Sequence, residues 1–332
     1  METNNGDILL SVRQLTTKFK INGRYYAAVD SVSFDIRRGE VFAIVGESGS
    51  GKTALVMSIL QLHGDTAQIS GNVIFNTSDT QKNLVSMTER ELVRIRGKEI
   101  GMVFQDPLTA LNPVMRVGVQ IEEALACHLK LGRRERKEKT LQLLANVAMP
   151  EPVRVSKQFP HELSGGMRQR AMMAIALACE PTLLLADEPT TALDVTVQAQ
   201  ILKLMRELQQ RSRMSILLVT HDLGVVAEAA ERVAVMYAGQ IVEVAHTSRL
   251  FSQARHPYTR ALLASASGFS KGNKRLHVIP GVAPTLSTMP RQGCRFANRM
   301  HSTTLHEPLP TLHEIFPGHL VLCTCHQELT NF

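Results

Sequence analysis

A glycine-rich segment that follows a short apolar run near residue 45 limits the folds open to this chain. The run covers residues 41–45 (VFAIV), and the segment over 46–53 reads GESGSGKT. This is a complete G-x-x-x-x-G-K-[ST] pattern, in which glycines let the chain turn back so that successive backbone N–H groups point inward. A helix-like stretch from Lys52 to about Leu62 follows. Because a strand and a helix flank the segment, the sequence predicts a phosphate-binding loop rather than a chance glycine-rich turn.

The residues of this loop divide into main-chain donors and two reactive side chains. The backbone N–H groups and the helix N-terminus are expected to hold phosphate oxygens. Lys52 supplies a point charge to the β- and γ-phosphates, and Thr53 offers its hydroxyl to Mg²⁺. The candidate nucleotide-binding residues of the loop are Gly46, Glu47, Ser48, Gly49, Ser50, Gly51, Lys52 and Thr53.

Two later apolar runs end in polar side chains. Residues 183–186 (LLLA) are followed by Asp187 and Glu188, and residues 216–219 are followed by Thr220 and His221. Ligands of open α/β sheets bind at the carboxyl ends of parallel strands. Asp187 is therefore expected to hold Mg²⁺, directly or through water, and Glu188 to polarise the attacking water. We assign His221 to sensing the γ-phosphate, because the neighbouring strands already lead to one phosphate site.

The order of expected elements indicates an α/β fold. Residues 9–36 alternate in β fashion around a turn at Asn22-Gly23 and predict an antiparallel edge hairpin. Strand and helix patterns then alternate, as in a largely parallel sheet covered by helices, and a mainly helical block from about 88 to 180 interrupts them. Within that block, residues 133–149 predict a charged helix, and Asp194 later predicts a helix N-cap. The apolar face of the charged helix would carry Leu141, Leu144, Val147 and Ala148.

Composition narrows the class of protein. With 44% hydrophobic and 20% charged residues, the chain has a globular balance and not that of a disordered protein. No apolar run approaches the ~20 residues needed to cross a bilayer, and no secretory signal is visible at the start. Five unevenly spaced cysteines favour a reducing compartment over a disulfide framework. We therefore expect an intracellular protein without a membrane span.

Motifs that follow one another along residues 9 to about 245 resemble those of ATP-binding cassette (ABC) ATPases. Besides the phosphate loop and the 183–188 run, LSGGMRQR at 163–170 resembles the signature motif. Gln105 in VFQDP resembles the glutamine loop, Asp194 in TALD the D-loop, and His221 the switch histidine. The resemblance implies a P-loop NTPase cassette with an antiparallel β edge subdomain, an inserted helical subdomain over about 105–180 and a small C-terminal appendage.

The family resemblance further implies that two cassettes face each other head to tail. Each ATP would then lie between the phosphate loop of one subunit and Ser164, Gly165 and Gly166 of the other, which precede a helix-like run and form a second anion site. Gln105 is expected to serve catalysis and to join Thr53 and Asp187 as a Mg²⁺ ligand. The implied catalytic residues are Lys52, Gln105, Glu188 and His221, and the implied nucleotide contacts include Asp194.

The family also implies an aromatic side chain near the N-terminus that stacks on adenine. Phe19 is at the resembling position, with Tyr26 as the alternative. A buried hairpin aromatic is an equally good interpretation of either residue.

Four further segments resemble the oligopeptide/dipeptide/nickel importer subfamily. They are QDPLTALNPVM at 105–115, HPYTRALLAS at 256–265, IPGVAP at 279–284 and GCRFANR at 293–299. The resemblance implies an ABC ATPase domain at 1–250, an oligopeptide/dipeptide-transporter-type extension at 251–332, and ATP and Mg²⁺ as cofactors. Such proteins are peripheral subunits at the cytoplasmic face of the inner membrane that energise import of peptides or similar small polar solutes. Their partners are two membrane permease subunits, a second ATPase subunit (the same or a paralogous chain) and, indirectly, an extracytoplasmic substrate-binding protein.

The C-terminal stretch departs from that subfamily pattern. Relatives commonly carry four tail cysteines resembling an iron–sulfur ligand set; here Cys294 and Cys323 match, Met300 replaces an expected cysteine, and Cys325 is a spare. Since such a cluster usually needs four thiolates, no stable iron–sulfur centre is expected. Three tail cysteines with His301, His306, His313, His319 and His326 could form a different metal site, although scattered residues of a regulatory tail are the simpler interpretation.

Charge and length weigh against other functions. Residues 249–332 hold nine Arg or Lys against three Glu, but no basic run and no aromatic stacking pattern, so no nucleic-acid partner is expected. A DNA-maintenance ATPase would need a long coiled coil between loop and signature, which the about 110 residues there cannot contain. A translation-factor cassette protein would carry two sets of motifs, whereas this sequence contains one set. A non-hydrolysing partner is disfavoured by the intact catalytic residues, while a nickel or metallophore importer of the same subfamily stays open.

Overall fold

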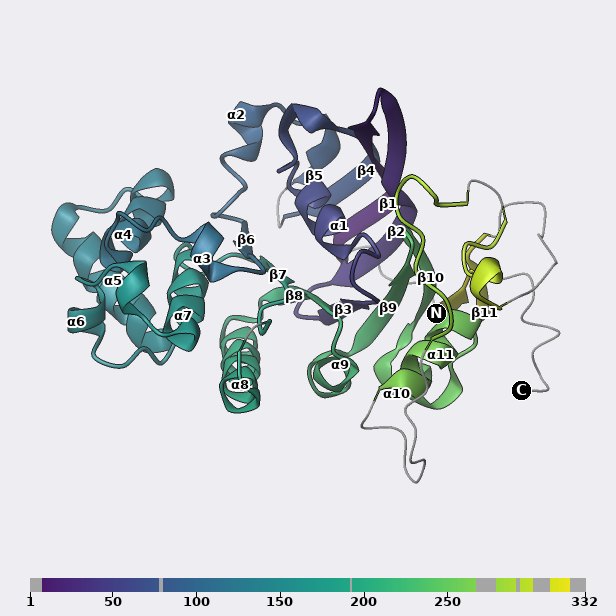
Figure 1. Cartoon of the computed structure of the whole chain (residues 1–332). Coiled ribbons are helices and arrows are strands. Elements are labelled where there is room, and N and C mark those ends of the chain that lie inside the picture. The colour runs from purple at the N-terminus through teal and green to yellow at the C-terminus, as the bar shows by residue number, and fades with distance from the viewer. Residues whose placement is uncertain are drawn as a thin grey trace. The chain divides into compact units, whose positions relative to one another are not determined.

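Two units make up the chain in this computed structural model, which describes residues 8–77, 80–191, 193–266, 279–290, 293–300 and 311–322 (Figure 1). The first unit contains Met1–Ile36, Val41–Ser86 and Thr220–Phe332. The second contains Arg37–Glu40 and Met87–Val219. The phosphate loop and the C-terminal extension therefore belong to one unit, and the expected signature helix belongs to the other.

An antiparallel sheet forms one part of the first unit. Its strand order is β2-β1-β4-β5, with bounds β1 Ile8–Ile21, β2 Arg24–Arg37, β4 Ala67–Asn76 and β5 Gln81–Asn83. Asn22 and Gly23 both have positive φ (49° and 79°), as a tight turn between twisted strands requires. The predicted antiparallel edge is thus confirmed, with its turn at the expected dipeptide.

The second sheet of the first unit carries the phosphate loop. Its neighbour order is β11-β12-β10-β9-β3, with bounds β11 His313–Phe316, β12 His319–Val321, β10 Gln240–His246, β9 Arg232–Tyr237 and β3 Val41–Val45. β3 pairs with β9 in parallel and the other pairs are antiparallel. All five residues of β3 are buried, as expected for a strand covered on both faces.

Helices of the first unit pack on its two sheets. They are α1 Lys52–Ile59, α9 Leu223–Ala229, α10 Thr247–Gln253 and α11 Pro257–Ser265, with short 3₁₀ turns at Gly64–Thr66, Leu84–Ser86 and Ala297–Met300. α10 and α11 both contact β10 (Figure 1). Tyr237, Tyr258 and Phe296 meet in one aromatic cluster, so residues beyond 250 share a core with strands β9 and β10.

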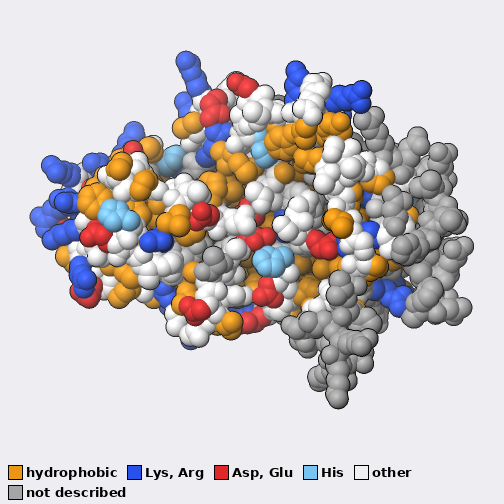
Figure 2. Space-filling view, in the orientation of Figure 1, with side chains coloured by type: hydrophobic (Ala, Val, Ile, Leu, Met, Phe, Trp, Pro, Cys, Tyr) orange, Lys and Arg blue, Asp and Glu red, His pale blue; other side chains and the backbone are white. Residues whose placement is uncertain are grey.

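The second unit combines parallel strands with a helical cluster. Strands β6 Ile100–Val103, β7 Leu183–Asp187 and β8 Ser215–Thr220 lie in the order β8-β7-β6 and pair in parallel. The helices are α2 Glu89–Leu92, α3 Pro107–Ala110, α4 Val117–His128, α5 Arg133–Asn146, α6 Pro152–Val155, α7 Gly165–Ala176 and α8 Val195–Ser212, with a 3₁₀ turn at Pro160–Glu162. α4, α5 and α7 contact one another in the inserted helical cluster (Figure 1). Basic side chains gather on the surface over this cluster (Figure 2), where α5 begins RRERKEK.

Helix α5 ends earlier than its sequence pattern predicts. The expected range reached Met149, but the helix stops at Asn146, and Ala148 is exposed with φ of 52°. The buried face uses Leu143, Leu144 and Val147. Among the described residues no helix combines the length and the apolar character needed to cross a bilayer.

Gly71 of β4 provides a test of the antiparallel sheet. It lies opposite an irregularity in β1, has φ of 96°, and an added Cβ would overlap the carbonyl oxygen of Gln14. We expect Gly71→Ala to lower the free energy of unfolding by about 1–3 kcal/mol in chemical denaturation. The matched control is Gly23→Ala, where φ is also positive but no atom lies within 4 Å, so its loss should be smaller. Equal losses in both variants would show that the close approach at Gly71 costs nothing.

Burial of His256 predicts a pH dependence of stability. The side chain is 1% exposed, and burial lowers its pKa from 6.5 to about 4, against the opposing attraction of Glu243. Between these pH values the unfolded chain binds a proton that the folded protein does not, so stability is lost as pH falls below 6.5, by up to ~1.4 kcal/mol per pH unit. Denaturation at pH 7, 6 and 5 should show a smaller slope for His256→Asn. His161→Asn, at an exposed histidine, should keep the wild-type slope; equal slopes in all three proteins would contradict the assignment.

Candidate nucleotide-binding site

The phosphate loop leaves β3 at Val45 and enters α1 at Lys52. Gly51 precedes the helix with φ of 103°, and a Cβ there would overlap the carbonyl oxygen of Ala28. The first turn of α1 contains no acidic side chain, so the positive end of the helix dipole is not neutralised locally. Ser50 Oγ is buried and has no hydrogen-bond partner among the described residues. The loop thus presents a buried hydroxyl and the positive end of a helix in the place where a phosphate group would fit.

Lys52 lies against the main chain of its own loop. Its side chain is 5% exposed, and Nζ donates to the carbonyl oxygens of Gly46 (2.8 Å) and Glu47 (3.0 Å). A buried ammonium group needs such partners, because burial of an unpaired charge is costly. Thr53 is exposed on the first helical turn, and its hydroxyl is of the hard oxygen type that Mg²⁺ prefers.

Glu47 joins the loop to distant parts of the first unit. Its backbone N–H donates to Tyr258 Oη (2.9 Å), and its carboxylate pairs with the guanidinium of Arg299 (2.7 Å). The motif pattern predicted Glu47 only as one residue of the loop and did not single out Tyr258 or Arg299. Tyr258 lies in the HPY segment and Arg299 in the GCRFANR segment. The sequence showed that both segments resemble those of a subfamily, but it did not show which residues they contact.

His221 and the adenine-stacking candidates complete the first unit. His221 is exposed directly after β8, and the next residue, Asp222, caps α9 by accepting from the N–H groups of Gly224 and Val225. Phe19 is half-buried on β1 and meets the His63 ring edge-on, with centroids 5.0 Å apart. Tyr26 is also half-buried, on β2, so the choice between these two aromatics stays a prediction.

The second unit brings Gln105 and Glu188 together. Glu188 follows β7 with φ of 45°, in the left-handed region that a side chain of this size seldom adopts. Its carboxylate accepts from Gln105 Nε2 (3.3 Å) and from Thr191 Oγ1 (2.8 Å), and its N–H donates to the carbonyl of Val219 (2.8 Å). These bonds hold the carboxylate at the end of β7. Thr191 is a further residue of the site that the sequence motifs did not single out.

Asp187 is the last residue of β7. It is 1% exposed, and its carboxylate offers hard oxygen ligands of the type that Mg²⁺ takes. Thr53, Gln105 and Asp187 therefore have the side-chain chemistry expected of the Mg²⁺ ligands.

The expected signature motif forms the start of α7. Ser164 is the N-cap, and its hydroxyl accepts from the N–H of Met167 (3.3 Å). Ser164 and Gly165 are exposed, and the first turn of α7 carries no acidic side chain. The N–H groups of Gly165 and Gly166 thus start a helix whose positive end can attract an anion. Asp194 is exposed and caps α8, accepting from the N–H of Val197 (3.0 Å).

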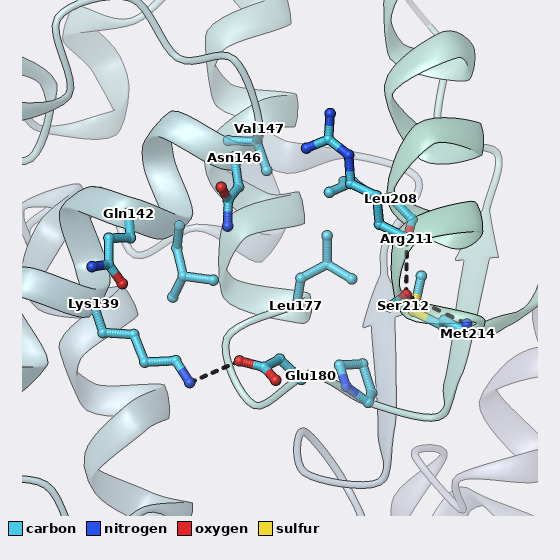
Figure 3. Close-up of a pocket in the computed structure, with 12 residues that line it drawn as sticks. Lys139, Gln142, Asn146, Val147, Leu177, Glu180, Leu208, Arg211, Ser212 and Met214 are labelled. Carbon is cyan, nitrogen blue, oxygen red and sulfur yellow. Dashed lines mark hydrogen bonds and ion pairs between the residues drawn. The ribbon is translucent and has the colours of Figure 1, made fainter.

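A cavity of about 440 Å³ in the second unit lies away from these residues (Figure 3). Residues of α5, α8 and the chain between α7 and β7 line it, with Leu177, Leu208 and Val147 on its walls. Lys139 and Glu180 form an ion pair across one side (3.0 Å; Figure 3). No predicted site residue lines it, so it is not the nucleotide site.

In the described part of the tail, the candidate metal ligands contact different partners. Cys294 packs against the aromatic core, His313 bonds to Thr311, and His319 is buried against Glu243 with Nε2 2.7 Å from the carboxylate. Within the described ranges no three His, Cys, Asp or Glu side chains group as metal ligands. The other tail candidates, Cys323, Cys325, His301, His306 and His326, lie outside the described residues, as does most of the stretch around them. The expectation of no iron–sulfur centre therefore stays a prediction.

Two family models match this chain in succession. The model described as "ABC transporter" matches residues 29–191, and the one described as "Oligopeptide/dipeptide transporter, C-terminal region" matches residues 242–304. A third, an AAA domain described as a putative AbiEii toxin, matches residues 157–227, which overlap the first match.

Relatives and solved structures agree with the two main matches. A probable peptide ABC transporter ATP-binding protein of Sinorhizobium fredii is 48% identical over 100% of this chain and 99% of that protein. The oligopeptide transport ATP-binding protein OppD of Lactococcus lactis is 48% identical over 86% of this chain and 83% of that protein. Among solved structures, the ATP-binding cassette MJ0796 in a dimeric post-hydrolysis state with ADP and Pi is 29% identical, with a TM-score of 0.64, over 72% of this chain and 99% of that one. On these sequence and structural grounds, this chain belongs to the ATP-binding subunits of the oligopeptide/dipeptide ABC transporter family, and its fold is that of an ABC cassette.

Proposed function

We propose that this chain is the ATP-hydrolysing subunit that energises import of peptides or similar small polar solutes through a membrane ABC transporter. The observation that carries the proposal is the complete ATPase residue set in a chain 48% identical, over its full length, to a probable peptide ABC transporter ATP-binding protein. Domain roles follow the sequence prediction, with the ATPase at 1–250, its helical subdomain at about 105–180, and the transporter-type extension at 251–332.

The chain's own groups divide the hydrolytic work. The Lys52 ammonium and the N–H groups of the loop hold the negative charge of the triphosphate, apart from the N–H groups of Glu47 and Ser50, which donate to Tyr258 Oη and to the Glu47 carbonyl. Glu188, fixed by Gln105 and Thr191, orients the attacking water and accepts its proton, and His221 hydrogen-bonds the γ-phosphate. Thr53, Gln105 and Asp187 would hold Mg²⁺, which when bound neutralises charge that develops on the phosphate oxygens.

A second ATPase subunit completes the site in this proposal. The Ser164–Gly166 turn, exposed at Ser164 and Gly165, would contact nucleotide held by the phosphate loop of another subunit, the same chain or a paralogue, with Asp194 close by. The exposure of this turn and the uncompensated start of α7 support the assignment. The dimeric state of the matching MJ0796 structures agrees with it.

The surface after Gln105 is the proposed contact with the two permease subunits. Phe104, Leu108 and Val114 are exposed apolar side chains (38%, 58% and 80%) within eleven residues of one another on the second unit. Apolar side chains on a surface mark contacts with another protein when they lie close together. This contact would keep the subunit peripheral at the cytoplasmic face of the inner membrane, and an extracytoplasmic substrate-binding protein would deliver the cargo to the permeases.

Glu188→Gln tests the hydrolytic assignment. The amide keeps the size of the side chain but cannot accept the proton of water, so ATP turnover should fall by about 10²–10⁴-fold. ATP binding should persist, and dimers should accumulate with ATP, detected by size-exclusion chromatography. Glu123→Gln, at an exposed position of α4, is the matched control and should keep wild-type turnover. Wild-type turnover in Glu188→Gln would remove Glu188 from this role.

Val114→Asp tests the permease contact. A charge in an apolar interface is poorly solvated, so co-purification with the membrane subunits and peptide uptake should both decrease about tenfold or more. Val282→Asp is the control, because Val282 is as exposed (88%) but lies in the C-terminal extension. Normal assembly of Val114→Asp, or equal loss in the control, would contradict this location of the contact.

A further inference from the structure

Side chains of the C-terminal extension contact the phosphate loop. Two of its side chains meet at Glu47, the second residue of the loop: Tyr258 of α11 and Arg299 of the 3₁₀ turn Ala297–Met300. All three residues belong to the first unit. Since Arg299 is 252 residues from Glu47 along the chain, this contact is made by the fold and not by local sequence.

Arg299 has the geometry of a clamp. Its guanidinium bonds both carboxylate oxygens of Glu47 (2.7 and 3.4 Å), and it also donates to the carbonyl oxygens of Ile279 (3.2 Å), Pro280 (2.7 Å) and Gly281 (3.3 Å). The residue is 6% exposed. Burial by itself would lower its pKa, but its ion pair with Glu47 and its proximity to Tyr237 outweigh that effect and raise the pKa, so the group stays charged. A planar, buried, multiply bonded guanidinium holds its partners in one geometry.

Glu47 connects Arg299 and Tyr258 to the backbone of the loop and to Lys52. Its N–H donates to Tyr258 Oη, its carbonyl accepts from Lys52 Nζ, and its carboxylate binds Arg299. Burial raises the pKa of the Tyr258 hydroxyl, which therefore stays neutral and can accept a hydrogen bond. A change at Arg299 or Tyr258 would thus alter the position of the carbonyl oxygen that holds the Lys52 ammonium group.

A second residue of the extension, Arg295, is connected to the loop at Ser50 through the turn between β9 and β10. Arg295 pairs with Asp30 and donates to the carbonyl of Ala238 in the β9–β10 turn. In that turn, the N–H of Gly239 donates to the carbonyl of Ser50 (2.8 Å). Arg295 and Arg299, both in the GCRFANR segment, therefore reach the loop by two separate routes, through Ser50 and through Glu47.

An aromatic cluster fixes the elements that carry these arginines. The Phe296 ring, between the two arginines in sequence, lies 5.3 Å from the Tyr237 ring and 5.4 Å from the Tyr258 ring. Tyr237 and Tyr258 are themselves 4.4 Å apart and almost fully buried. Packed rings of this kind leave little freedom to the backbone that carries them.

We propose that Arg299 and Tyr258 are positioning residues for ATP binding, through which the C-terminal extension holds the phosphate loop in its nucleotide-binding geometry. This inference rests on the proposed role of residues 46–53 in binding ATP. A glycine-rich loop loses conformational freedom when it closes around phosphate, and contacts that order it beforehand reduce that cost. Arg299 also neutralises the Glu47 carboxylate, which unpaired would repel a triphosphate.

The test compares ATP affinity in the full chain and its variants. Arg299→Gln removes the charge and the bidentate bond, and the dissociation constant of Mg-ATP should rise about tenfold, measured by titration with a fluorescent ATP analogue. The KM for ATP should rise in parallel, while kcat at saturating ATP changes less. Global loss of structure would instead lower the active fraction and kcat and leave KM unchanged.

Three further variants separate positioning from folding. Tyr258→Phe removes only the hydroxyl that accepts from Glu47, so its affinity should fall while the aromatic packing stays, even if Arg299→Gln does not fold. Arg299→Lys keeps the charge and should recover part of the affinity. Arg249→Gln is the matched control: this arginine lies in α10, just before the extension, 5.6 Å from the Phe316 ring and does not touch the loop, so the ATP affinity of the variant should equal that of the wild type.

A double-variant cycle identifies the route. If Arg299 acts through Glu47, Arg299→Gln combined with Glu47→Gln should bind ATP no worse than Arg299→Gln alone. Independent, additive losses, or wild-type affinity in both a folded Arg299→Gln and Tyr258→Phe, would overturn the inference. Lys52→Ala separates this failure from failure of the proposed function: wild-type ATP binding in Lys52→Ala would reject the loop as the ATP site, whereas loss there with normal binding in Arg299→Gln rejects only the positioning role.

Discussion

The position of the Lys52 ammonium group is the constraint on which the rest of the nucleotide site depends. The side chain is almost fully buried and is held by the carbonyl oxygens of Gly46 and Glu47. Burying a charge is unfavourable unless fixed dipoles replace the lost water. The loop must therefore keep the carbonyls of Gly46 and Glu47 turned to Lys52 while its N–H groups, apart from those of Glu47 and Ser50, stay available to an anion. Carbonyl and N–H groups can point in these different directions only if the loop backbone is held at several points. The hydrogen bonds from the Glu47 N–H to Tyr258 and from the Gly239 N–H to the Ser50 carbonyl hold it at two of them.

Local patterns predicted the parts of the site that depend on neighbouring residues. The strand at 41–45, the glycine-rich turn and the helix from Lys52 form from adjacent residues, so their order in the sequence was sufficient. The caps by Ser164 and Asp194 are also local, each accepting from an N–H three residues later. By contrast, the meeting of Gln105 with Glu188 spans 83 residues, and only the family resemblance, not their spacing, suggested that they act together.

Other features could not be read from the pattern because tertiary contacts decide them. Strand β6 lies inside the block expected to be mainly helical, since Ile100–Val103 pairs with β7, eighty residues later in the chain. The early end of α5 at Asn146 lets Ala148 adopt a left-handed backbone and brings Met149 into the core, where the helical pattern had expected Ala148. The link between Glu47 and Arg299 was hidden for the same reason. From sequence alone, an arginine in a tail with an excess of basic residues is expected to be exposed to solvent, and only the structure shows its pairing with Glu47.

The HPY segment shows how a buried carboxylate can determine the geometry of a distant loop. Glu243 of β10 is fully buried and accepts from the N–H groups of Arg255 (2.8 Å) and His256 (2.9 Å), while the His319 ring lies on the same carboxylate. These bonds fix the start of α11, where His256 Nδ1 caps the helix by accepting from the N–H of Tyr258 (3.1 Å). The Tyr258 ring is thereby aimed so that its hydroxyl meets the N–H of Glu47. Each step uses a group that would be costly to leave unpaired in the core, so the polar groups of the extension and the phosphate loop favour one common arrangement.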